Sequence, residues 1–192
     1  MILSMFLTFE KELGIDIFVY NLIKPFICPT LTKFFKYVTW FGSAIGILIF
    51  TAVFLVLLKD NRYKIAMLLN LIGSVLLNQG LKFFFMRERP KDIFLVEETG
   101  FSFPSGHSSV ALAFYGFLIY LVWTRFQNIK LKITLIVILL SLIILIGISR
   151  IYLGVHYFSD VLGGYLITLA YLILFIIILD KKKFIPRFDN IK

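Results

Sequence analysis

The sequence is poor in charged residues and in cysteine. Only 16% of its 192 residues are charged, whereas 60% are hydrophobic; a typical soluble domain is about 25% charged and about 45–50% apolar. This balance argues against a soluble fold and makes membrane lipids the first expected partner. Because Cys28 is the single cysteine, an intramolecular disulfide and a cysteine-based metal site are both excluded.

The chain is nevertheless basic, with a net charge of +9. A nucleic-acid partner would require these charges to form one extended polar face. The Lys and Arg residues instead fall in short clusters between apolar runs. We therefore expect no nucleic-acid binding, and the sequence does not indicate an oligomeric state.

Five apolar stretches are long enough to cross a bilayer core, which needs about 20 residues of helix. They cover residues 39–58, 64–84, 107–124, 131–148 and 159–179. The sequence therefore predicts an all-α integral membrane protein, a helical bundle of five or six transmembrane helices. We expect one domain over residues 1–192, with the bundle at 39–180.

Residues 1–38 have a different pattern. They are apolar and aromatic but include seven charged residues: Glu10, Lys11, Glu12, Asp16, Lys24, Lys33 and Lys36. Pro25 and Pro29 interrupt any long helix. We expect an interfacial amphipathic segment here, and a sixth span is the alternative.

The connectors between the spans differ in charge. Basic residues gather after the first, third and last spans: Lys59, Arg62 and Lys64; Arg125, Lys130 and Lys132; Lys181, Lys182, Lys183 and Arg187. The positive-inside rule assigns these to the cytoplasm. Connectors 85–106 and 149–158 then lie together on the periplasmic or exterior side of the plasma membrane.

The first outer connector begins with cations. Lys82 lies inside an apolar run, and Arg89 precedes Pro90, which biases it away from helix. If the helix continues to Arg89, seven residues make about two turns and both cations share one face. They would then converge on one anion. Alternatively, the Arg residues here only mark the end of a span, but a buried unpaired Lys82 is costly.

The same connector ends at a predicted helix start, in the order Pro104, Ser105, Gly106, His107. Proline and serine suit the first turn of a helix, and Gly106 allows a ligand to approach the backbone. Free amides at a helix N-terminus bind phosphate. An ordinary capped helix with an interfacial histidine is the alternative.

The second outer connector contains Arg150, His156 and Asp160. On a helix, a spacing of four places the Asp160 carboxylate beside the His156 ring, where it would fix the tautomer that leaves the other nitrogen nucleophilic. A structural His–Asp pair is the alternative. The chain has only two histidines, and both fall in the connectors predicted to share one membrane face.

In order and spacing, these three groups resemble the signature of the type 2 phosphatidic acid phosphatase superfamily, which also includes vanadium-dependent haloperoxidases. The groups are Lys82-x6-Arg89-Pro90, Pro104-Ser105-Gly106-His107 and Ser149-Arg150-x5-His156-x3-Asp160. Every signature position is filled. Bacterial membrane members usually have six helices, and the expected first span is weak here.

The resemblance implies a phosphatase with a phosphohistidine intermediate and no cofactor. His156 would attack phosphorus, Asp160 would stabilise its ring, and His107 would protonate the leaving oxygen and then activate water. The cationic and amide groups would hold the phosphoryl oxygens: Lys82, Arg89, Ser105, Gly106 and Arg150. No metal is expected, although Asp92, Glu97 and Glu98 lie nearby in sequence.

The resemblance further implies a lipid phosphate substrate, of the undecaprenyl diphosphate, phosphatidylglycerophosphate or phosphatidate class. A catalytically inactive lipid-binding or scaffold protein of the same fold is the non-enzyme alternative. A haloperoxidase would use nearly the same pocket, but the membrane spans argue against it. A transporter would need further charged residues deep in the spans, and we find none.

Overall fold

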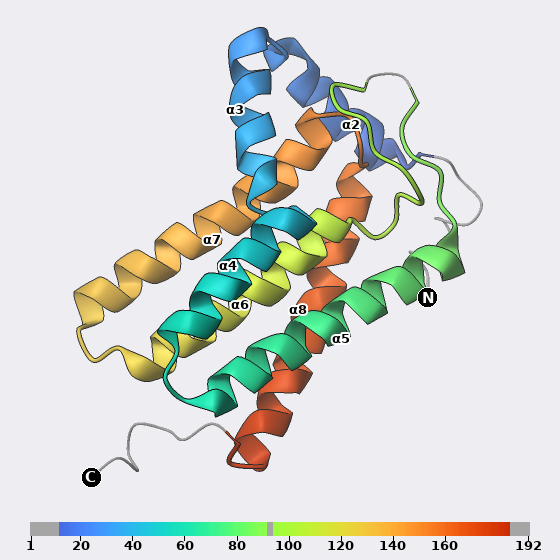
Figure 1. Ribbon diagram of the computed structural model, residues 1–192. Coiled ribbons are helices and arrows are strands. Elements are labelled where there is room, and N and C mark those ends of the chain that lie inside the picture. Colours follow the sequence, from blue (N-terminus) through green and yellow to red (C-terminus); the bar gives the residue numbers. More distant parts are fainter. Residues whose placement is uncertain (1–11, 92–93, 185–192) are drawn as a thin grey trace.

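The computed structural model describes residues 12–91 and 94–184 (Figure 1). Within these ranges the regular elements are α2 Gly14–Ile23, the 3-10 turn η1 Lys24–Phe26, α3 Pro29–Trp40, α4 Ala44–Leu57, α5 Asn61–Phe85, α6 Gly106–Arg125, α7 Ile129–Tyr152 and α8 Phe158–Lys181. Every one of them is helical. The predicted all-α class is confirmed.

In the part of the chain that the structure describes, four helices are long and apolar enough to cross a membrane: α5, α6, α7 and α8. The bent pair of α3 and α4, which meet at 48°, provides a fifth crossing if it is counted as one span. A continuous helix over residues 39–58 was the wrong prediction, because the chain breaks between Trp40 and Ala44. Alone, α4 has 14 residues, a length of about 21 Å, too short for a bilayer core about 30 Å thick.

Local chemistry accounts for the break. The Ser43 hydroxyl caps α4 by accepting a hydrogen bond from the Gly46 amide at 3.0 Å, and it donates to the Trp40 carbonyl at 2.7 Å. A Cβ on Gly42 would lie 2.7 Å from the Ile146 side chain. Gly42 therefore allows the bend to pack directly against α7.

The N-terminal third packs onto one end of the bundle. Pro25 lies in the 3-10 turn and Pro29 begins α3, so the prolines interrupt the helix as predicted. Helix α2 contacts α8 and α7, while α3 runs along α7. The predicted boundary at residue 38 falls inside α3. Location at a membrane interface stays a prediction.

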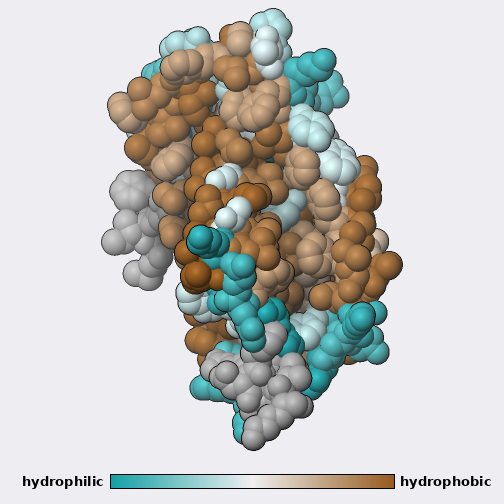
Figure 2. Space-filling model, turned by 90° about the vertical axis from the view of Figure 1, so that its left-hand side faces the viewer, coloured by the Kyte–Doolittle hydropathy of each residue, from teal (hydrophilic) through white to brown (hydrophobic). Residues whose placement is uncertain are grey.

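The core surrounds α6, which packs against α4, α5, α7 and α8. Its inward side chains, such as Phe114 and Phe117, are buried. Large apolar side chains elsewhere point outward, and Figure 2 shows them over much of one face. An apolar exterior suits lipid as the surrounding solvent.

A stripe of polar side chains runs along the buried face of α5: Asn70, Ser74, Asn78 and Lys82. They are four residues apart and therefore share one face of the helix. The Asn70 amide donates to the Ala113 carbonyl at 2.7 Å, and the Asn78 amide donates to the Ser109 hydroxyl at 3.0 Å. This stripe fixes α5 against α6 and ends at Lys82, where the two connectors predicted to face outward meet.

Candidate functional site

A cavity of about 300 Å³ lies where the two connectors meet. It is lined by Gln79, Lys82, Phe83, Arg89, Glu98, Thr99, Gly100, Phe101, Gly106, His107 and His156. Five of the eight predicted site residues are among them: Lys82, Arg89, Gly106, His107 and His156. The other three, which are buried and do not line the cavity, are Ser105, Arg150 and Asp160.

His156 is held by groups on both ring nitrogens. Nε2 lies 3.2 Å from the Arg89 guanidinium, and Nδ1 lies 3.5 Å from the Asp160 carboxylate and 3.3 Å from the Ser102 hydroxyl. A guanidinium can only donate, so Nε2 must accept and the ring proton belongs on Nδ1. Burial, opposed by Asp160, lowers the pKa of His156 to about 4. The ring is thus neutral at pH 7, with the lone pair of Nε2 accepting a hydrogen bond from Arg89.

The predicted contact between His156 and Asp160 is present, but the helical geometry assumed for it was wrong. His156 precedes α8, and Asp160 lies in the first turn of that helix. One Asp160 oxygen accepts the Tyr157 amide at 2.9 Å and the Ser102 hydroxyl at 2.5 Å. The Asp160 carboxylate thus caps the start of α8 through the Tyr157 amide, and in this turn it also lies beside the His156 ring.

Arg89 reaches the cavity by another route than predicted. Helix α5 ends at Phe85, with Met86 in the left-handed conformation, so Lys82 and Arg89 do not share a helix face. The Arg89 guanidinium donates to the carbonyls of Val155, Gly100 and Thr99 at 2.9–3.0 Å. Burial lowers its pKa. These carbonyls orient the Arg89 guanidinium, which extends from the loop after α5, toward His156.

Lys82 lies at the end of the α5 stripe and is largely buried. Its ammonium donates to the Phe101 carbonyl. This bond connects the helix to the loop that precedes Ser105. Lys82 and Arg89 therefore converge on the same cavity, as the sequence predicted, although from two different elements.

The second motif forms the start of α6. Ser105 is its N-cap and accepts hydrogen bonds from Ser108, so the Ser105 side chain lies behind the cavity wall. Its own amide donates to the Asp160 carbonyl at 3.1 Å. A Cβ on Gly164 would lie 3.1 Å from the Ser105 carbonyl oxygen. Glycine at this position in α8 lets the two helix starts touch, and Gly106 and His107 then line the cavity.

Arg150 is almost fully buried and is not among the residues that line the cavity. Its guanidinium donates to the Thr39 hydroxyl at 2.7 Å and to the Glu98 carboxylate. The second Glu98 oxygen is 4.0 Å from Arg89. Arg150 is therefore linked to the cavity through a carboxylate that lies between the two arginines.

Three residues that support the site were missed from the sequence: Asp16, Arg87 and Ser102. Glu98 was considered only as a metal ligand, not as a partner of Arg150. Ser102 carried a weak signal, because it is a polar residue between Phe101 and Phe103 just before the second motif. Arg87 resembled an ordinary span-end cation. Asp16 carried no local signal, because its partners are distant in sequence.

The acidic loop does not form a metal cluster among the residues described here. Glu97 is exposed and Glu98 pairs with Arg150; Asp92 lies outside the described residues. No group of three His, Cys, Asp or Glu side chains suited to a metal ion occurs within residues 12–91 and 94–184. The cationic cavity instead offers positive charge from its own side chains.

Comparison with known proteins gives a family model, a curated relative and two solved structures that are similar to this chain. The family model described as PAP2 superfamily matches residues 63–184. Phosphatidylglycerophosphatase B of Bacillus subtilis (strain 168) is 41% identical over 103 residues, 53% of this chain and 50% of that relative. The match thus spans half the length of that curated relative.

Two solved structures share the fold. The crystal structure of the first transmembrane PAP2 type phosphatidylglycerolphosphate phosphatase from Bacillus subtilis superposes with a TM-score of 0.78 at 31% identity, covering 96% of this chain and 94% of that one. Aquifex aeolicus LpxE gives a TM-score of 0.70 at 26% identity, covering 86% of this chain and 97% of that one.

Proposed function

This chain belongs to the PAP2 superfamily, and from that premise we propose that it is a membrane lipid phosphatase with a phosphohistidine intermediate. The observation that carries the proposal is the cationic cavity of Lys82 and Arg89, which contains both histidines of the chain. A neutral His156 with its lone pair on Nε2 is suited to attack phosphorus once a bound phosphate replaces Nε2 as the acceptor for Arg89. The two cations offset the charge on the transferring phosphoryl group.

The proposed reaction has two steps. In the first, Nε2 of His156 forms a bond to phosphorus, the bond from phosphorus to the leaving oxygen breaks, and His107 gives that oxygen a proton. In the second, water attacks phosphorus, gives a proton to His107, and the nitrogen–phosphorus bond breaks. Asp160 stabilises the charged His156 ring in both steps. The amides at the start of α6 complete the phosphoryl site, and Arg150 joins it by exchanging Glu98 for a phosphoryl oxygen.

A lipid substrate is supported by a second cavity of about 520 Å³ between α4, α5 and α6. It shares Gln79, Gly106 and His107 with the cationic cavity. Its other lining residues are mostly apolar, among them Ile47 and Leu71. A phosphate head group in the first cavity would therefore leave its chain against an apolar surface of the bundle.

Among lipid phosphates, a phosphatidylglycerophosphate-class head group is favoured, because the names of the Bacillus subtilis relative and of the Bacillus subtilis crystal structure both specify this substrate. Undecaprenyl diphosphate and phosphatidate are the other classes to test. Phosphate release from the three lipids should be measured with purified full-length protein in detergent and EDTA, with His156→Ala as the matched control. Lipid binding without release by the wild type would favour the inactive lipid-binding alternative.

We also propose that the site faces the periplasm or exterior, following the Lys and Arg asymmetry of the connectors. In a Cys28→Ser background, single cysteines replace Glu97 or Asn61 in turn. A membrane-impermeant thiol reagent applied to intact cells should label position 97 and spare position 61. The reverse pattern would place the site on the cytoplasmic side without affecting the chemistry.

A further inference from the structure

Behind the nucleophile, one arginine joins two buried acids. The Arg87 guanidinium donates to Asp160 at 2.6 Å and to Asp16 at 2.9 Å. All three side chains are at most 2% exposed. The Arg87 guanidinium also lies over the Tyr157 ring, with its central carbon 4.2 Å from the ring centroid.

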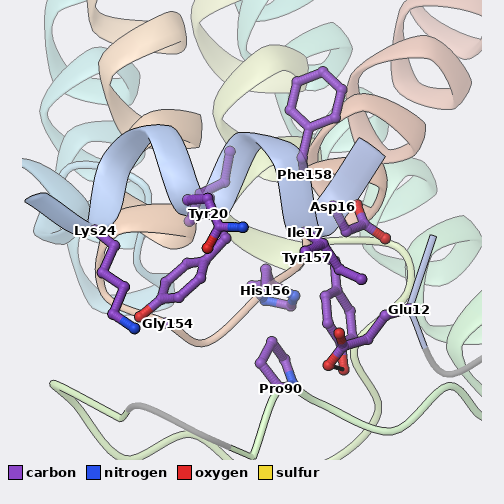
Figure 3. Close-up of a pocket in the computed structure, with 12 residues that line it drawn as sticks. Glu12, Asp16, Ile17, Tyr20, Lys24, Pro90, Gly154, His156, Tyr157 and Phe158 are labelled. Carbon is purple, nitrogen blue, oxygen red and sulfur yellow. Dashed lines mark hydrogen bonds between the residues drawn. The ribbon is translucent and has the colours of Figure 1, made fainter. Parts of the chain in front are cut away.

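Asp16 is brought to this point by α2, far from the three sequence motifs. It accepts the Ser159 amide at 2.7 Å and the Ser159 hydroxyl at 2.8 Å. Figure 3 shows α2 lying across this region, where Asp16, Tyr157 and His156 line a cavity of about 240 Å³. The N-terminal third therefore supplies a carboxylate, Asp16, to the residues that hold Asp160 beside His156.

The two oxygens of the Asp160 carboxylate have different partners. Its Oδ1 is held by Arg87, while its Oδ2 accepts the Tyr157 amide and the Ser102 hydroxyl and faces His156. A guanidinium is a rigid planar donor that can bridge two carboxylates at once. With Asp16 fixed to α8 and Arg87 fixed to Asp16, the plane of the Asp160 carboxylate is fixed as well.

We propose that Asp16 and Arg87 are positioning residues that act through Asp160 on His156, an inference that rests on the phosphatase function proposed above. Neither residue lines the cationic cavity. Their effect is therefore on the rate of nucleophilic attack, by keeping Nδ1 protonated and Nε2 aimed at phosphorus. The competing explanation is that Asp16 only caps the start of α8 and contributes to folding alone.

A double-mutant cycle separates these explanations. Asp16→Asn is introduced into the wild type and into an Asp160→Asn background, and single-turnover rates are measured for full-length protein with an activated aryl phosphate. In the wild type the rate should fall about 10- to 100-fold, because a small misplacement of the reacting groups lowers the rate by about this factor. In the Asp160→Asn background it should fall less than about 3-fold, because the carboxylate through which Asp16 acts is already gone.

Arg87→Lys provides a second variant that keeps the charge but lacks the rigid fork, in which one nitrogen reaches Asp160 and the other reaches Asp16, and it should follow the same pattern. Glu88→Gln is the matched control: Glu88 is adjacent to Arg87, 59% exposed and paired with Lys91, so its loss should leave both backgrounds unchanged. Equal losses in the two backgrounds, or no loss in the wild type, would overturn the proposal. Absence of turnover in the wild type itself would instead count against the phosphatase function.

Discussion

Glu98 accepts a hydrogen bond from the buried Arg150 guanidinium, and its other carboxylate oxygen lies 4.0 Å from Arg89. A carboxylate therefore lies between two of the cations proposed to hold the phosphoryl oxygens. An incoming phosphate has to compete with it for Arg150. Glu98 is 28% exposed whereas the Arg150 side chain is 1% exposed, so water screens this pair only in part.

The first prediction follows from this competition. Glu98→Gln should strengthen inhibition by inorganic phosphate up to roughly 5-fold, which corresponds to about 1 kcal/mol. The inhibition constant would be measured with purified protein at fixed pH and ionic strength. Glu97→Gln makes the same charge change at an exposed neighbour and should have little effect. Weaker phosphate inhibition in Glu98→Gln would mean that Glu98 holds Arg150 in place instead.

The second prediction concerns the arginines themselves. Arg89→Ala and Arg150→Ala should each lower kcat by about 10²–10³, the usual loss for one donor that stabilises transition-state charge. Steady-state phosphate release would measure the loss, and Glu97→Ala should be nearly unaffected. An acidic substitution that abolishes activity while the arginine variants keep it would contradict the metal-free cationic site.

The sequence predicted the lining of the cavity better than its supports. Lys82, Arg89, His107 and His156 were identified because they fall in three motifs on one predicted membrane face, and the resemblance to the superfamily signature implied their roles. Their routes into the cavity were not identified. Helix α5 ends at Phe85, where Met86 is left-handed, and Arg89 is oriented by carbonyls such as that of Val155, 66 residues away.

The supports were missed because they depend on tertiary contacts. Asp16 lies 71 residues from Arg87 and 143 from Ser159, separations over which no periodicity in the sequence carries information. The α3–α4 bend was missed for a related reason. An apolar run specifies that a segment is buried in lipid, whereas a single Gly42-Ser43 step decides whether it is one helix or two.

The third prediction concerns pH. His156 must be neutral to attack, and burial lowers its pKa to about 4 from an ordinary value of about 6.5. Therefore kcat/KM should stay high as the pH falls through 6.5 and should decline only near pH 4. The profile reports macroscopic values, because His107 shares the cavity. A decline centred near 6.5 would mean that His156 is solvated in the free enzyme.

The same shift should appear in stability. Because the folded-state pKa is depressed, the unfolded chain binds more protons between pH 6.5 and about 4. The stability contributed by neutral His156 is thus fully present above pH 6.5 and is lost as the pH falls towards 4. Thermal unfolding in detergent should show this loss, and His156→Gln should show a smaller one.

The last prediction tests the covalent intermediate and the different roles of the two histidines. His156→Ala lacks the nucleophile and should form no phosphoenzyme. His107→Ala keeps the nucleophile but lacks the acid and the base that activates water, so it should accumulate a phosphoenzyme with an aryl phosphate whose leaving group needs no proton. A phosphoramidate is stable in alkali and labile in acid. Brief incubation with phosphorus-labelled substrate, followed by an alkaline quench, should therefore retain label on His107→Ala, and acid treatment should release it. Label on His156→Ala but not on His107→Ala would reverse the assignment of nucleophile and acid.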